Sequence, residues 1–155
     1  MAILQKLKEH FSRDSVTLDL QEIQALILRS RPEPYVGVHA MLHFDEAAGA
    51  RNLLGRLAPH IASADNWSED LDFWIGAALS FEGLKALGVP DAQLKTFPLP
   101  FQQGMAARAE QLRDFGPNAP ENWEDVFKPG NCHLALTIYA VDDDALDKAL
   151  ATART

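Results

Sequence analysis

Three stretches of the chain alternate between apolar and other residues, which is the pattern of a β-strand with one buried face. They run from Tyr35 to Phe44, from Leu71 to Ser80 and from Asn131 to Ala140. The apolar positions of the alternation are Val36, Val38, Ala40, Leu42 and Phe44, then Phe73, Ile75, Ala77 and Leu79, then Cys132, Leu134, Leu136 and Ile138. The pattern predicts three strands that contribute to one apolar face of a sheet.

Apolar residues about one turn apart predict two helices before the first strand. Ile3, Leu7 and Phe11 mark a short amphipathic helix at the start of the chain. The second helix has Asp19 as its expected N-cap and ends near Arg29 to Arg31, because the two prolines that follow disfavour helix in the residues before them.

Helices also follow the first and third strands, where they can cover the apolar face. Asp45 is the expected N-cap of the first, and Pro59 is expected to kink or end it. The last helix begins at Asp142, where acidic side chains cap the helix rather than bind a cation. Between the second and third strands lies a helical insert with helices over Phe81 to Leu87 and Phe101 to Arg113. This order of elements predicts an α+β two-layer sandwich.

Composition narrows the range of partners. The chain has 155 residues and 47% hydrophobic content, which suits one globular domain. It carries 14 basic and 22 acidic residues, with no basic stripe, so nucleic acid and anionic membrane surfaces are not expected as partners. Cys132 is the only cysteine, which excludes a disulfide within the chain and indicates a reducing compartment. We therefore expect a cytoplasmic protein with no membrane span.

Several short sequence motifs between the second and third strands resemble those of a known family. They are Phe81-Glu82-Gly83-Leu84 with Ala86-Leu87-Gly88-Val89-Pro90, Gly104 with Arg108-Ala109, and Pro120-Glu121-Asn122-Trp123. In this order they resemble the first half of a dye-decolourising-type (DyP-type) haem peroxidase. The resemblance begins at Leu18 and continues to Leu136.

The resemblance implies a protein of two ferredoxin-like halves with haem in the second half. Residues 1–17 are then an N-terminal helix and connector, and 18–155 are the N-terminal ferredoxin-like domain. The family places its distal acid in a Gly-x-x-Asp-Gly motif, which this sequence does not contain. No catalytic residue is carried over, and we expect neither haem nor peroxidase turnover in this chain alone. Arg113 stands where the family usually has glycine, so that turn is expected to be built differently.

The resemblance also implies a last strand that pairs beside the first. This sequence ends after its second covering helix, so the sandwich is expected to lack that strand and to leave the strand from Tyr35 to Phe44 at an edge. Such an edge invites pairing with a second copy, with the missing half or with the N-terminal segment. We expect a homo-oligomer formed through this edge or through the sheet face without helices.

Ligand-type side chains gather on the sheet face opposite the helices. They are His39, Met41, His43, Trp74, His133, Thr137 and Tyr139. The favoured interpretation is an interface with the absent half or a partner chain, since mixed aromatic and Met surfaces are common at interfaces. A metal or haem site is the alternative. His39 and His43 lie roughly 13 Å apart along a strand, so only a cross-strand pair such as His39 with His133 could share one ion.

Two single residues have simpler expected roles. Cys132 falls on the apolar face, so we expect a small buried hydrophobe rather than a nucleophile. Gly104, a lone glycine in a predicted helix, indicates close packing.

Three functions stay open at this stage. The first is the N-terminal half of a DyP-type peroxidase, present as a fragment or as a remnant that serves as an assembly module. The second is a stand-alone dimeric α+β ligand-binding domain with His39, Trp74 and His133 in its pocket. The third is a small haem-dependent or cofactor-free oxidoreductase formed across a dimer.

Overall fold

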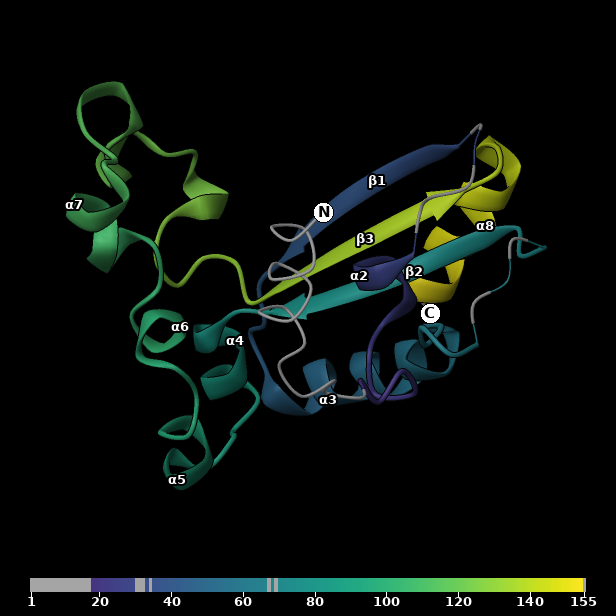
Figure 1. Ribbon diagram of the computed structural model, residues 1–155, viewed down its shortest axis with the longest axis horizontal. Coiled ribbons are helices and arrows are strands. Elements are labelled where there is room, and N and C mark those ends of the chain that lie inside the picture. The colour runs from purple at the N-terminus through teal and green to yellow at the C-terminus, as the bar shows by residue number, and fades with distance from the viewer. Residues whose placement is uncertain (1–17, 30–32, 34, 67, 69, 155) are drawn as a thin grey trace, which may run out of the picture.

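A three-stranded antiparallel sheet forms the centre of the computed structural model, which describes residues 18–29, 33, 35–66, 68 and 70–154 (Figure 1). The strands are β1 (Val36–Leu42), β2 (Phe73–Leu79) and β3 (Leu134–Ala140), in the spatial order β1-β3-β2. All three predicted strands are confirmed, each slightly shorter than expected. β1 lies at one edge of this sheet, as the sequence predicts.

Two helices, α3 (Ala47–Leu57) and α8 (Asp143–Arg154), cover one face of the sheet (Figure 1). The core between these layers consists of Leu57, Ile75, Leu134, Leu136, Ile138 and Ala149. Alternation along β3 explains this arrangement, because Leu134, Leu136 and Ile138 are all 2% exposed or less. The predicted α+β two-layer sandwich is confirmed.

The two covering helices begin in different ways. Asp142 Oδ1 accepts a hydrogen bond of 2.8 Å from the Ala145 N–H, so the predicted cap of α8 is confirmed. The prediction for α3 was wrong, because its N-cap is Glu46 without a side-chain bond, and not Asp45. The α-helical part of α3 ends at Leu57, and the residues around Pro59 form the 3₁₀ turn η1 (Ala58–His60).

The segment before β1 contains far less helix than predicted. Its only described helix is α2 (Ala25–Leu28), and Asp19 accepts a hydrogen bond from Gln21 N–H in a local turn instead of capping a long helix. The physical reason is pairing with a distant loop. Ala25 N–H donates to Ala62 O at 2.7 Å, and Ala64 N–H donates to Ile23 O at 2.7 Å. These bonds pair the backbone around Gln24 with the loop at Ser63 and hold Gln24 extended, so the helix begins only at Ala25. The helix predicted around Ile3 to Phe11 lies outside the described residues.

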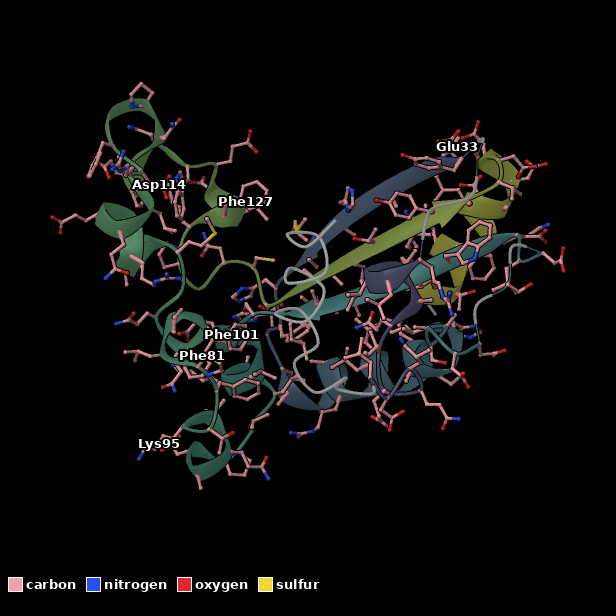
Figure 2. The ribbon with its side chains drawn as sticks, viewed as in Figure 1. Glu33, Phe81, Lys95, Phe101, Asp114 and Phe127 are labelled. Atoms are coloured by element: carbon pink, nitrogen blue, oxygen red, sulfur yellow. The ribbon has the colours of Figure 1, made fainter. Side chains whose placement is uncertain are left out.

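The insert between β2 and β3, residues 81–131, projects beyond the end of the sheet (Figure 1). It consists of short helices and 3₁₀ turns. These are α4 (Phe81–Ala86), α5 (Asp91–Leu94), α6 (Leu99–Gln103), η2 (Ala106–Arg108), α7 (Ala109–Leu112), η3 (Gly116–Asn118), η4 (Pro120–Asn122) and η5 (Asp125–Phe127). Figure 2 shows Phe81 beside Phe101, with ring centroids 5.9 Å apart, so aromatic packing joins α4 to α6.

A single helix from Phe101 to Arg113 was therefore a wrong prediction. Gly104 ends α6 with φ of 72°, and a Cβ built there meets nothing within 4 Å. Its role is a turn that needs positive φ, and not close packing. Arg113 has φ of 63° and ψ of 34°, so the arginine adopts the left-handed conformation that glycine favours. This conformation costs a non-glycine residue about 1 kcal/mol.

Candidate interface on the open sheet face

On the sheet face away from α3 and α8, no described helix packs over β1 and β3. We call this surface the open face, and its residues are Gly37, His39, Met41, Ala135, Thr137 and Tyr139. The register places His39 opposite Thr137, and His39 Nδ1 lies 3.0 Å from Thr137 Oγ1 in a hydrogen bond. The small side chain at Ala135 allows another surface to approach β3 closely at that position.

Aromatic rings gather at one end of the open face. Tyr139 packs edge-to-face against Tyr35, with ring centroids 5.1 Å apart, and against His39 at 6.0 Å. The Tyr139 ring lies over Gly37, since a Cβ built at Gly37 would sit 2.6 Å from the ring atom Cδ1. The missing side chain at Gly37 is thus what lets Tyr139 lie across β1.

The half of this face over β2 is covered. Trp74 is 1% exposed and donates from Nε1 to Ser68 O at 3.1 Å. Gly76 is buried beneath Leu26, whose Cδ1 would lie 3.1 Å from a Cβ at that position. Trp74 therefore belongs to the packing of the domain and contributes no surface to the open face.

His133 and His43 lie together at the end of the sheet nearest the insert. Their rings stack with centroids 4.1 Å apart and planes 28° apart. His133 is 7% exposed, and its Nδ1 accepts a hydrogen bond of 2.9 Å from Phe44 N–H. Burial lowers the pKa of His133, and the neighbouring His43 lowers that pKa further.

The structure does not bring together the histidine pair that the sequence suggested. His39 pairs in register with Thr137, four residues along the strand from His133. His43 Nδ1 donates to Asn131 O at 3.2 Å, and stacked rings do not direct their nitrogens at a common point. Within the described ranges, no group of three His, Cys, Asp or Glu side chains is placed to hold a metal ion.

Cys132 was expected on the apolar face, and this prediction was wrong. Cys132 precedes β3, is half-buried, and places its Sγ 3.8 Å from the Sδ of Met41 on the open face. The alternation fails here because the strand begins only at Leu134.

These contacts also test the fit of a haem group. An axial ligand needs an imidazole nitrogen directed at the iron from a site that can enclose the ring system. His133 is buried and its Nδ1 accepts from Phe44 N–H, while His43 is stacked on it. His39 is exposed and its Nδ1 is bonded to Thr137 Oγ1. The described residues do not fit a haem site.

Among the described residues, no helix has the length and hydropathy to cross a bilayer.

Gln24 shapes the sheet although nothing in the sequence pattern predicts this role. The side-chain amide of Gln24 donates to Ala77 O at 2.7 Å and accepts from Ala77 N–H at 2.8 Å. Gln24 thus forms hydrogen bonds with both outward backbone groups of Ala77, as a neighbouring strand would. No local signal marks it, because the two residues are 53 positions apart.

An antiparallel sheet with two helices packed on one face is the arrangement of a ferredoxin-like α+β domain. Residues 47–155 match the family model described as the DyP dimeric alpha+beta barrel domain. This match covers most of the chain, so the protein belongs to that family, the N-terminal domain of DyP-type peroxidases. A search of curated protein sequences found no match.

Solved structures agree with this assignment. An ancestral D-type dye-decolourising peroxidase matches with a TM-score of 0.71 and 26% identity, over 88% of this chain and 30% of that one. A dye-decolourising peroxidase variant in complex with cyanide matches with a TM-score of 0.67 and 25% identity, over 86% and 30%. The peroxidase of Auricularia auricula-judae shares the fold, with a TM-score of 0.69 and 22% identity over 88% and 30%. The chain spans about 30% of the length of these structures.

Proposed function

We propose that this chain is the N-terminal, non-catalytic half of a DyP-type peroxidase, a family that carries out peroxide-dependent oxidation of organic substrates. Its role is to support a second ferredoxin-like unit. The observation that carries the proposal is the family match over residues 47–155. The open face supports it, because the small and aromatic residues over β1 and β3 suit contact with another sheet.

The chemistry of peroxide reduction is not assigned to this chain. The sequence has no Gly-x-x-Asp-Gly motif, and the contacts of His43 and His133 do not fit an axial role. A side chain that can transfer a proton does not catalyse peroxide reduction unless the peroxide is bound beside it.

The test is to produce the 155-residue chain in cells supplied with haem and to record its absorbance spectrum and its peroxide-dependent dye oxidation. A globin produced in the same way serves as the positive control for haem loading. We expect no Soret band that co-purifies with the chain and no turnover. A stoichiometric Soret band together with turnover would overturn the proposal and favour an oxidoreductase formed across a dimer.

A second candidate is a dimeric assembly module, and the hydrogen-bond pattern at the β1 edge favours it. Ser80 N–H donates to His133 O at 3.0 Å, and Val141 N–H donates to Asp72 O at 3.0 Å. These two bonds lie at opposite ends of the β2 and β3 pair. They establish that residues 135, 137 and 139 of β3 direct their backbone groups toward β2.

The intervening residues of β3 therefore bond to β1, through the pairs that contain Val38 and Ala40. Gly37, His39 and Met41 direct their N–H and C=O groups outward. Among residues 18–29, 33, 35–66, 68 and 70–154, none supplies a backbone partner for these groups. Analytical ultracentrifugation at micromolar concentration tests the module: a dimer supports it, and a monomer counts against it.

The proposal includes a cytoplasmic location. Its support is the single cysteine, which suits a reducing compartment. Cell fractionation with an antibody against the chain tests this point, and recovery from an extracellular fraction would contradict it.

A further inference from the structure

His133 lies where the insert returns to the sheet. Its N–H donates to Leu42 O at 2.8 Å, at the end of β1, and its carbonyl accepts from Ser80 N–H at 3.0 Å, just after β2. Its side chain accepts from Phe44 N–H at 2.9 Å. His133 therefore connects the ends of β1 and β2 at the point where the insert returns to the sheet.

The side-chain bond to Phe44 requires a neutral imidazole. An N–H group donates, so Nδ1 of His133 must carry a lone pair and the ring proton must be on Nε2. Protonation of Nδ1 turns this acceptor into a donor and leaves two N–H groups facing each other. Phe44 packs against the hydrophobic core, so its N–H loses its partner in a poorly hydrated place.

The surroundings of His133 resist a positive charge. Burial is the first cause of its lowered pKa, and the stacked His43, from the end of β1, is the second. Three groups act in the other direction: the carboxylate of Glu82 on α4, the carboxylate of Asp45 after β1, and the Gly130 backbone. Glu82 already forms an exposed ion pair of 2.9 Å with Lys85, which reduces its pull on His133.

His133 is in direct contact with the first helix of the insert. A Cβ at Gly83 would overlap the His133 carbonyl, so α4 lies in direct contact with this residue. The Ser80 hydroxyl reinforces the junction, because it donates to Cys132 O at 2.7 Å and accepts from Gly83 N–H at 2.9 Å. The start of the insert and its end are thus fastened at the same place.

We propose that His133 and His43 form an acid-sensitive latch between the sheet and the insert. The latch is closed when His133 is neutral, and it opens locally when His133 takes up a proton. Opening breaks the bond to Phe44 and releases the base of the insert, while the core under α3 and α8 stays packed. This inference concerns the folding of the chain itself, so it stands whether or not the chain supports a peroxidase.

The direction of the pH dependence follows from proton linkage. The closed state has the lowered pKa and binds the proton less well than the open state, in which His133 has its ordinary pKa of about 6.5. The latch is therefore fully stable above that pH and weakens as the pH falls. Between the two pKa values, the opening constant rises about tenfold for each unit of pH lost.

Two NMR measurements on the intact chain test the latch. A histidine titration gives the pKa of each imidazole, and amide hydrogen exchange, corrected for its intrinsic pH dependence, gives the opening constant at Phe44 and along α4. We expect a pKa for His133 below the ordinary histidine value. We also expect the opening constant to rise on acidification at Phe44 and Gly83 more than at Ile138 in the core.

Variants separate the latch from general acid unfolding. His133→Asn keeps an acceptor near the Nδ1 position but does not titrate, so the acid-dependent opening should be lost. His43→Gln removes the neighbouring charge, so the pKa of His133 should rise and the acid response should shrink. His60→Gln is the matched control, because His60 is exposed on η1, and it should leave the response unchanged.

Two results would overturn the latch. One is a His133 pKa at or above the ordinary value. The other is an unchanged acid response at Phe44 in both His133→Asn and His43→Gln. If His133→Asn does not fold, the His43→Gln measurement still decides the question.

Discussion

The two edge strands of the sheet differ in what bonds to their outward backbone groups. At the β2 edge, the Gln24 amide bonds to both outward groups of Ala77, and Leu26 lies over Gly76. At the β1 edge, the outward groups of Gly37, His39 and Met41 have no such cover among the described residues. The β2 edge is bonded at Ala77 by a side chain of the segment before β1, and among the described residues the β1 edge has no such bond.

The residues of β1 are also consistent with an edge that pairs. Edge strands in stable monomers usually carry lysine, proline or other features that prevent pairing. β1 reads Val-Gly-Val-His-Ala-Met-Leu and has no Lys, Arg, Asp or Glu. An uncharged edge of this kind supports the proposal that β1 pairs with another strand, either of a second copy or of a longer protein.

Proline substitutions in β1 should give the largest effect and test which groups point outward. Val38→Pro removes an N–H that bonds to β3, and we expect it to lower the free energy of unfolding by about 3 kcal/mol. His39→Pro removes an outward N–H and one exposed side-chain bond to Thr137, so its cost should be about 1 kcal/mol. Urea unfolding followed by circular dichroism measures both.

The same two proline variants also test self-association through β1. His39→Pro should also weaken any dimer formed through the β1 edge, as seen by ultracentrifugation. Equal destabilisation by the two prolines would show that the assignment of inward and outward groups is wrong, and the comparison of the edges would fail with it.

Removing the Gln24 amide from the β2 edge should have the next largest effect on stability. Gln24→Ala leaves Ala77 N–H and C=O without their side-chain partners at a half-buried position, and we expect a loss of about 2 kcal/mol in unfolding free energy. The variant should also self-associate more strongly, because both edges are then exposed. Gln93→Ala, at an exposed position on α5, is the matched control and should change neither property. A wild-type unfolding curve for Gln24→Ala would contradict the proposed role of the amide.

The strands and their apolar face could be predicted from the sequence because each obeys a local rule. Period-two alternation at Leu134, Leu136 and Ile138 requires only that one face be buried. The Asp142 cap is equally local, since its oxygen reaches a backbone N–H three residues away. Such features need no knowledge of the rest of the chain.

The features that could not be predicted depend on distant contacts. Asp19 begins no long helix because residues 23–25 pair with the loop around Ser63. Trp74 alternates like a residue of the open face, but the segment before it folds back and buries it. In both cases tertiary pairing overrides a local pattern, which is where sequence periodicity gives no information.

The smallest expected effect compares one glycine from each edge strand. A Cβ at Gly37 would meet Tyr139 Cδ1 at 2.6 Å and the Ile138 backbone oxygen at 3.0 Å, so Gly37→Ala should cost about 1 to 2 kcal/mol. The tightest contact of a Cβ at Gly76 would be the end of the flexible Leu26 side chain at 3.1 Å, and its other neighbours lie at 3.7 Å or more, so Gly76→Ala should cost less than about 0.5 kcal/mol. Thermal unfolding with both variants measured in parallel decides the point. A larger cost at Gly76 would mean that Leu26 is held more rigidly over β2 than Tyr139 is over β1, and the β2 edge would then be the more tightly packed of the two.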